Sequence, residues 1–198
     1  MPLLASLKTG APYHLLSYGT LLGSTLFQSF IAGPLAFRAL PRPQFATLQS
    51  SVFPVYFILQ TSLSFILALT FPAPRSPLTA STIPVGALPH QHLASTSTGG
   101  FSGLLQPTNR AALVQLGLIF ITSLANLTLV GPATTRTMRE RKHQETRDGV
   151  RAYDAGPQSP EMVRLNRRFG ILHGVSSLAN LVGFLAVVGY GVGLSERL

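Results

Sequence analysis

Four long uncharged runs constrain this chain more than any other feature of its sequence. They cover residues 14–37, 52–71, 110–130 and 169–193, and apart from a boundary arginine none of them contains a charged side chain. About twenty apolar residues, rising 1.5 Å each in an α-helix, match a bilayer hydrocarbon core of about 30 Å. The sequence therefore predicts an all-α fold, a four-helix transmembrane bundle.

The connections between the runs predict how the helices pair. A short, proline-broken connection around Pro41 and Pro43 predicts that the first two helices form an antiparallel hairpin. With 198 residues in total, no room remains for a separate soluble catalytic domain. We expect a short N-terminal tail over residues 1–13, and a membrane domain over 14–198 built as two antiparallel helical hairpins. Its long connections are a flexible Pro/Ser/Thr-rich loop at 72–108 and a basic loop at 131–168, which begins as a solvated extension of the third helix.

The positive charge of the chain is concentrated on one side of the predicted membrane. The net charge is +9, and nine of the fifteen Lys and Arg residues lie between Arg136 and Arg168. The positive-inside rule places the first and third connections in the cytosol and both termini in a lumen or outside the cell. This pattern predicts a multi-pass protein of an endomembrane or the plasma membrane.

Basic residues beside membrane helices commonly contact anionic headgroups. We predict this role, or contact with a cytosolic partner, for Arg38, Arg42, Arg136 and Arg139. The position of the charges beside the runs argues against nucleic acid as a partner.

A short motif occurs at the end of the first run and again at the end of the third. Both read Gly-Pro-x-x-x-Arg, over residues 33–38 and 131–136. A proline at this position bends or ends the helix near the interface, and the arginine one turn later can reach lipid phosphates. The motif favours two hairpins related as a parallel repeat, although chance and shared topology explain it almost as well.

The polar side chains inside the runs are neutral. Four amides, Gln28, Gln60, Asn126 and Asn180, lie at depths at which they could meet inside the bundle. The favoured interpretation is that they form hydrogen bonds between helices, and the alternative is that they line a path for a solute. Pairs of small residues that allow close helix packing occur at Gly19, Gly23, Gly170 and Gly174.

The residue types needed for catalysis or metal binding do not form a recognisable set. The chain has no cysteine, its first acidic residue is Glu140, and no charged side chain lies deep in any run. The five histidines are dispersed over different runs and connections, and the pair His90 and His92 lacks a third rigid ligand. We therefore predict no cofactor, no metal and no enzymatic activity.

Several motifs together resemble a known family. They are the stretches 14–20, 37–45, 48–57, 131–136 and 169–181, and their combination resembles the transmembrane protein 205-like family. That resemblance implies a four-span eukaryotic membrane protein whose shared domain has no established biochemical activity, and it brings no catalytic residues. The loop at 72–108 departs from the compact animal members and looks like a fungal-type expansion.

The sequence is compatible with two functions. The leading hypothesis is a structural or adaptor component of endomembranes that contacts membrane lipids, with a second copy of itself or another membrane protein as a further partner. The alternative is a passive or facilitated transporter for a small neutral or amphipathic solute, with Gln28, Gln60 and Asn180 along its path.

Overall fold

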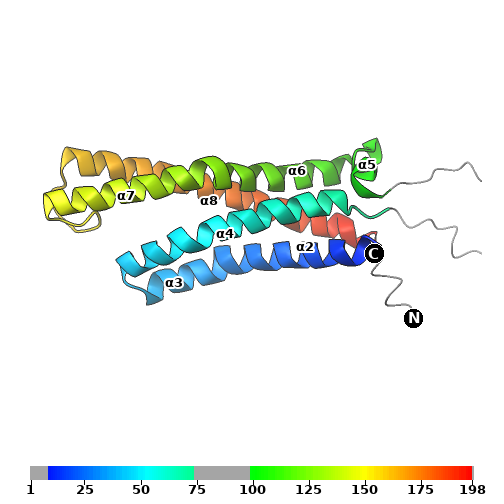
Figure 1. Cartoon of the computed structure of the whole chain (residues 1–198), viewed down its shortest axis with the longest axis horizontal. Helices are drawn as coiled ribbons and strands as arrows, with labels where there is room; N and C mark the ends of the chain where they lie inside the picture. Colours follow the sequence, from blue (N-terminus) through cyan, green and yellow to red (C-terminus); the bar gives the residue numbers. More distant parts are fainter. Residues whose placement is uncertain (1–8, 74–98, 198) are drawn as a thin grey trace, which may run out of the picture.

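Four helical rods run side by side in the computed structural model, which describes residues 9–73 and 99–197 (Figure 1). The rods extend over Ala11–Ala39, Arg42–Leu69, Pro107–Asp148 and Pro160–Ser195, and each is long and apolar enough to cross a membrane. Every regular element in the described residues is helical. The prediction of an all-α, four-helix membrane bundle is confirmed.

The rods are built from shorter elements in the order of the chain. The first comprises α2 (Ala11–Leu26), a π-helical turn η1 (Phe27–Ala32) and α3 (Gly33–Ala39), and the second is α4 (Arg42–Leu69). After the short helix α5 (Gly100–Leu104) and the 3₁₀ turn η4 (Pro107–Asn109), the third comprises α6 (Arg110–Ala125), a π turn η5 (Asn126–Val130) and α7 (Gly131–Asp148). The fourth is α8 (Pro160–Ser195).

The helices close into a ring of neighbours. The pairs α2 with α4 and α6–α7 with α8 form two antiparallel hairpins, and α4 packs against α6 while α2 contacts α8. The main apolar core lies in the half of the bundle near the chain termini, where Leu21, Leu67, Ile119 and Val187 are buried. Towards the other end the two hairpins separate (Figure 1).

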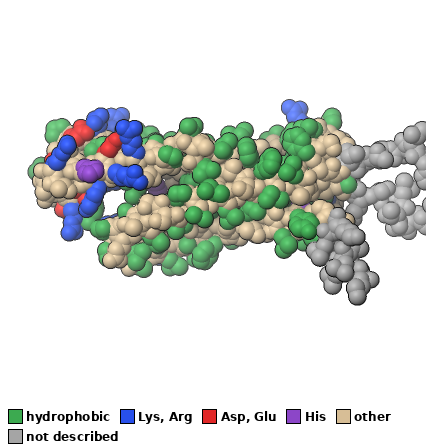
Figure 2. Space-filling model, viewed as in Figure 1, with side chains coloured by type: hydrophobic (Ala, Val, Ile, Leu, Met, Phe, Trp, Pro, Cys, Tyr) green, Lys and Arg blue, Asp and Glu red, His purple; other side chains and the backbone are tan. Residues whose placement is uncertain are grey.

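Large apolar side chains cover the outside of the rods, as lipid contact requires. The most exposed of them include Leu16, Val55, Ile121, Leu129 and Val192. Figure 2 shows apolar side chains spread over the middle of the bundle, with most of the charged side chains on this face gathered at one end. The bundle thus exposes to its surroundings the kind of surface that a bilayer solvates.

Each Gly-Pro motif occupies the same structural position. Proline lacks an N–H donor and its ring clashes with the carbonyl four residues earlier, and in both hairpins the helix widens into a π turn just before it. The Gly33 N–H donates to the Gln28 carbonyl and the Gly131 N–H to the Asn126 carbonyl, five residues back in each case. A wider turn of this kind accommodates the proline without breaking the rod.

Glycine is needed before each proline because the widened turn crowds this position. A Cβ at Gly131 would lie 2.6 Å from the Asn126 carbonyl oxygen, and one at Gly33 would lie 3.0 Å from that of Gln28. The correspondence extends inward at the same offset of 98 residues, since the buried residues Leu21 and Thr25 correspond to the buried residues Ile119 and Ser123. The two hairpins therefore share a repeated local architecture.

The connections are more ordered than we expected. Residues 131–148 and 160–168 of the predicted basic loop are helical, so the turn between α7 and α8 spans only 149–159. Gly149 ends α7 in the left-handed region, with φ of 67°. The Ser159 hydroxyl donates to Asp148 at 2.6 Å and accepts from the Met162 N–H at 3.1 Å, which joins the end of α7 to the start of α8.

The flexible loop predicted over 72–108 is wrong for its last part. Residues 74–98 lie outside the described residues, but residues 100–104 and 107–109 are helical. Leu104 is buried in the core, and the Asn109 side-chain amide donates to the Gly103 carbonyl at 2.7 Å. A single apolar anchor and this hydrogen bond order a segment whose composition is that of a loop.

The glycine pairs that we predicted for helix packing do not lie against the other helices of the bundle. Gly19, Gly23, Gly170 and Gly174 are exposed, and a Cβ at any of them would meet nothing within 4 Å. The close approaches are instead made by three other glycines of α8. A side chain there would meet Thr122 at Gly183, Gln115 at Gly189 and the ring of Tyr18 at Gly191.

Candidate functional site

The polar side chains inside the bundle are engaged with one another. The Gln60 side chain on α4 donates to the Thr25 hydroxyl on α2 at 3.1 Å and to the Tyr56 hydroxyl at 2.8 Å. The hydroxyl of the next residue, Thr61, donates to the Ser123 hydroxyl on α6 at 3.1 Å. Adjacent residues of α4 therefore link it to both neighbouring rods, at the corresponding positions of the two hairpins.

An amide pair recurs at the π turn of each hairpin. The Gln28 side chain donates to Gln49 on α4 at 3.4 Å, and the Asn126 side chain donates to Asn180 on α8 at 3.4 Å. The sequence led us to consider that all four predicted amides could meet. The structure brings only Asn126 and Asn180 together, because Gln28 and Gln60 each bond to other partners.

Asn126 is the most enclosed of these amides. It is fully buried, and its side-chain nitrogen also reaches the Ser176 carbonyl at 3.4 Å. Within the described residues its Oδ1 atom has no hydrogen-bond partner. Both of its bonds are long, so we expect their contribution to stability to be small.

We therefore predict a weak coupling between the two asparagines. Double-mutant cycles of hydrogen bonds inside membrane proteins average about 0.6 kcal/mol, and a cycle of Asn126→Ala and Asn180→Ala should give a coupling energy of about that size. The measurement is unfolding by SDS titration in mixed micelles, followed by circular dichroism. A cycle of Asn126→Ala with Ser177→Ala should give no coupling, because Ser177 is an exposed residue of α8, the helix that carries Asn180. A coupling above about 2 kcal/mol would show that the pair has a larger structural role than its geometry indicates.

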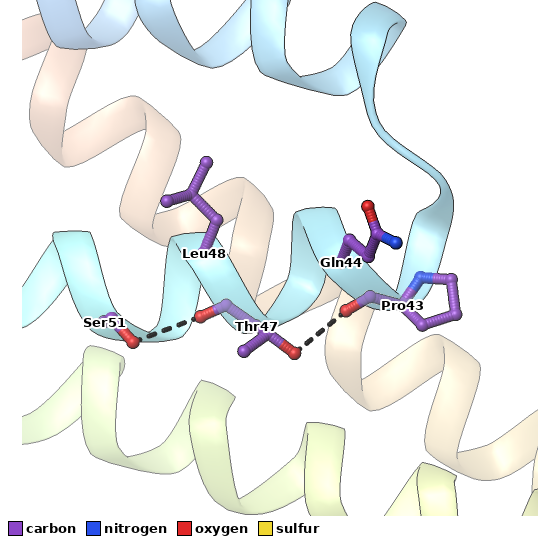
Figure 3. Close-up of a pocket in the computed structure, with 5 residues that line it drawn as sticks. All are labelled: Pro43, Gln44, Thr47, Leu48 and Ser51. Carbon is purple, nitrogen blue, oxygen red and sulfur yellow. Dashed lines mark hydrogen bonds between the residues drawn. The ribbon is translucent and has the colours of Figure 1, made fainter.

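One shallow depression lies near the separated end of the hairpins (Figure 3). It has a volume of about 510 Å³, and its lining residues, Pro43, Gln44, Thr47, Leu48 and Ser51, all belong to the start of α4. The hydroxyls of Thr47 and Ser51 donate to carbonyls of their own helix. With one helix as its only wall, this depression is an open surface and does not enclose a solute.

The end of the bundle beyond the Gly-Pro motifs is a basic helical hairpin, which we define as residues 136–168 of α7 and α8 with the turn between them. Figure 2 shows its Lys and Arg side chains interspersed with carboxylates. Glu140 pairs with Arg136 at 3.1 Å and with Arg168 at 3.4 Å, which links the two helices. Arg164 pairs with Glu161 on its own helix at 2.6 Å. Exposed pairs of this kind add little stability individually.

Arg141 contributes to the packing of α7 against α8 in this hairpin. Its Nε donates to the Asn166 side chain on α8 at 2.9 Å, and its guanidinium lies 4.6 Å from the centre of the Phe169 ring. Partial burial lowers the pKa of Arg141, and the neighbouring Glu145 carboxylate acts in the opposite direction. Arg141 therefore holds α7 against α8 and is less available to an outside ligand.

The four arginines predicted to contact headgroups are exposed at this same end. Arg38 lies in the last turn of α3, and Arg42 begins α4 with its guanidinium 3.9 Å from the centre of the Phe37 ring. Arg136 and Arg139 lie on α7. Several arginines of this end form no hydrogen bond, ion pair or ring contact with the described part of the chain; they are Arg38, Arg139, Arg147 and Arg167. Their charges are free to interact with other molecules.

A second polar cluster, near the termini, was not anticipated from the sequence. The His14 ring on α2 bonds to the Thr70 hydroxyl at 3.0 Å and to the Tyr190 hydroxyl at 2.8 Å. Because the Thr70 hydroxyl donates to the Ile66 carbonyl, His14 Nδ1 must donate to Thr70 and Nε2 must accept from Tyr190. His14 and Tyr190 are 176 residues apart, and no spacing rule connects residues so distant.

The described residues include no group of three His, Cys, Asp or Glu side chains placed to hold a metal ion. The pair His90 and His92 lies outside the described residues. His143 and His173 are exposed on α7 and α8. The polar groups of the bundle thus form hydrogen-bonded links and a basic surface.

Comparison with known proteins gives a family but no activity. Residues 16–143 match the model of a domain of unknown function, DUF4149, which covers well over half of the chain. The chain is also similar to "Xanthocillin biosynthesis cluster protein D" of Aspergillus fumigatus, with 52% identity over 61 residues, 31% of this chain and 39% of that protein. The chain therefore aligns with about two fifths of the length of this relative. No solved structure matches it.

Proposed function

We propose that this chain, which belongs to the DUF4149 family, is a non-enzymatic membrane adaptor whose basic end contacts anionic headgroups on the cytosolic face. The contacts are made by Arg136 and Arg139 of the basic helical hairpin and by Arg38 and Arg42 beside it. The observation that carries this proposal is the projection of α7 and α8 beyond the α3–α4 turn (Figure 1). All four arginines are exposed at this end, and Arg38 and Arg139 form no hydrogen bond, ion pair or ring contact with the described part of the chain. Four membrane helices hold this basic surface at the interface.

The family resemblance and the distribution of charge suggest where the protein works. Within DUF4149 we place it with the transmembrane protein 205-like proteins, on the motifs that include residues 131–136 and 169–181. The positive-inside rule then orients the basic hairpin towards the cytosol, and both termini towards a lumen or the outside, in an endomembrane or the plasma membrane. Membrane lipids are the first partners, and a second copy or another membrane protein is a further partner.

The alternative of solute transport is less well supported. The three amides that would line the path form hydrogen bonds between or within helices; they are Gln28, Gln60 and Asn180. A path for a solute would need those groups to be available. The name of the Aspergillus relative refers to a biosynthesis cluster, which is compatible with either hypothesis.

The test is the preference of the protein for anionic over neutral phospholipid. In the variant with Arg38, Arg42, Arg136 and Arg139 all replaced by glutamine, this preference should fall at least about tenfold. The reason is that each basic residue near an anionic surface contributes about 1 kcal/mol. Native mass spectrometry of the full chain in mixed micelles with phosphatidylserine and phosphatidylcholine measures the preference directly.

A matched control uses the tip of the same hairpin. Arg147→Gln with Arg151→Gln removes charge far from the Gly-Pro motif and should leave most of the lipid preference intact. An unchanged preference in the fourfold variant, with circular dichroism showing an intact fold, would contradict the proposal.

A further inference from the structure

A small polar cavity lies at the opposite end of the bundle from the basic hairpin. It has a volume of about 210 Å³ and lies between the start of α6 and the end of α8. The residues that matter for its chemistry are Phe71, Asn109, Gln115, Tyr190, Glu196 and Arg197. Neither the family nor the relative assigns a ligand to it.

The Arg197 guanidinium is held in place at this cavity by two neighbours. Its Nη2 donates to the Asn109 side-chain oxygen at 2.5 Å, and its central carbon lies 4.9 Å from the centre of the Phe71 ring. Asn109 is itself fixed by its bond to the Gly103 carbonyl. The other terminal nitrogen, Nη1, is buried and has no hydrogen-bond partner among the described residues. A buried, unpaired donor on a charged group is costly and indicates a missing acceptor.

Gln115 is a second polar side chain without a partner in the described chain, and it lines the same cavity as Arg197. The Gln115 amide is half-buried and forms no hydrogen bond with the described part of the chain. It reaches the cavity across Gly189, where a Cβ would come within 2.8 Å of its Nε2 atom. Thr108 also lines the cavity, and the start of α6 has no side-chain cap. An acceptor in the cavity would therefore meet a guanidinium, an amide and the positive end of a helix dipole.

Two other side chains limit what the cavity can accept. The Tyr190 hydroxyl already donates to His14, so it can accept a hydrogen bond from a ligand but cannot donate one. Glu196 is exposed beside the cavity and forms no ion pair with Arg197 within the described residues. Its negative charge weakens anion binding without occupying the Nη1 position.

We propose that this cavity binds an oxyanion, the carboxylate or phosphate group of a small acid or of an acidic lipid headgroup. Arg197 Nη1 donates the charged hydrogen bond and Gln115 Nε2 donates a second one to the same group. The volume of the cavity fits such a group.

The experiment measures binding to the full chain in neutral detergent, with three probes. Acetate and inorganic phosphate represent soluble acids and are titrated by calorimetry. Phosphatidic acid represents a headgroup, and its adducts are measured by native mass spectrometry. A soluble probe whose binding Arg197→Gln weakens identifies a free acid as the source, whereas weakened binding of phosphatidic acid alone identifies a lipid headgroup.

Arg197→Gln should weaken the binding of the active probe about tenfold, because a hydrogen bond to a charged group is lost. Gln115→Leu should weaken it about threefold, and Glu196→Gln should strengthen it. The matched control is Arg110→Gln, which removes an equal charge from an exposed residue at the same end that does not line the cavity.

Three results would overturn the proposal: no probe binds, Arg110→Gln weakens binding as much as Arg197→Gln, or Glu196→Gln has the opposite sign. If Arg197→Gln fails to fold, the Gln115 and Glu196 variants decide. Because the basic end is itself proposed to bind anionic headgroups, phosphatidic acid binding at the cavity is measured as the difference between wild type and these variants, none of which changes the basic end.

Discussion

Replacing Gly131 by alanine is expected to lower the free energy of unfolding by about 1–3 kcal/mol. The added Cβ would lie 2.6 Å from the Asn126 carbonyl oxygen. The atom it meets belongs to the backbone of the π turn and cannot move without changing the path of the rod. SDS titration followed by circular dichroism measures the change.

The same helical rod supplies the control. Gly117 lies on α6, and a Cβ there would meet nothing within 4 Å. Gly117→Ala should therefore be neutral or stabilising by up to about 1 kcal/mol, as expected from helix propensity. Gly33→Ala should cost less than Gly131→Ala, because its contact of 3.0 Å is looser. Equal stabilities of the Gly131 and Gly117 variants would show that the π turn does not require glycine.

Replacing Gln60 by leucine is expected to cost about 1–2 kcal/mol. Gln60 is 4% exposed and donates two hydrogen bonds, one of which joins α4 to α2. Leucine removes both donors and leaves the Thr25 and Tyr56 oxygens with one partner fewer. Ser62→Leu, at an exposed position of the same helix, is the control and should be neutral.

The Gln60 variant also separates the adaptor from the transporter. In sealed liposomes we expect no leak of small solutes with wild type, and none with Gln60→Leu or Gln28→Leu. A leak in wild type that these variants abolish would make the amides the lining of a path, and the protein a transporter. Loss of stability without any leak would leave them as structural hydrogen bonds.

The features that could be predicted from the sequence are those that follow from helix length and from the apolar interior of a bilayer. The four uncharged runs have the length and apolar composition of spanning helices, and the proline in each Gly-Pro motif marks where a rod must deform. The amides were predicted to bond between helices, and Asn126 with Asn180 and Gln60 with Thr25 do so.

The rotation of each helix about its own axis could not be predicted in the same way. Lipid and a neighbouring helix are both apolar, so hydropathy does not say which face a residue such as Gly19 or Gly170 presents. Both face outward, and α8 uses Gly183, Gly189 and Gly191 instead. Residues 100–109 are ordered because Leu104 packs into a core formed by distant segments. The composition of the segment itself does not predict that contact.

The electric field of the membrane reaches only part of the way along the basic hairpin, because the hairpin projects beyond the other helices. From Arg136 to Asp148 the axis of α7 rises about 18 Å, roughly two Debye lengths at physiological ionic strength. Charges at the base of the hairpin lie within the ionic atmosphere of the bilayer, whereas those at its tip are screened from it. The tip is therefore electrically independent of the lipid below, and a bound molecule there would sense the bulk electrolyte.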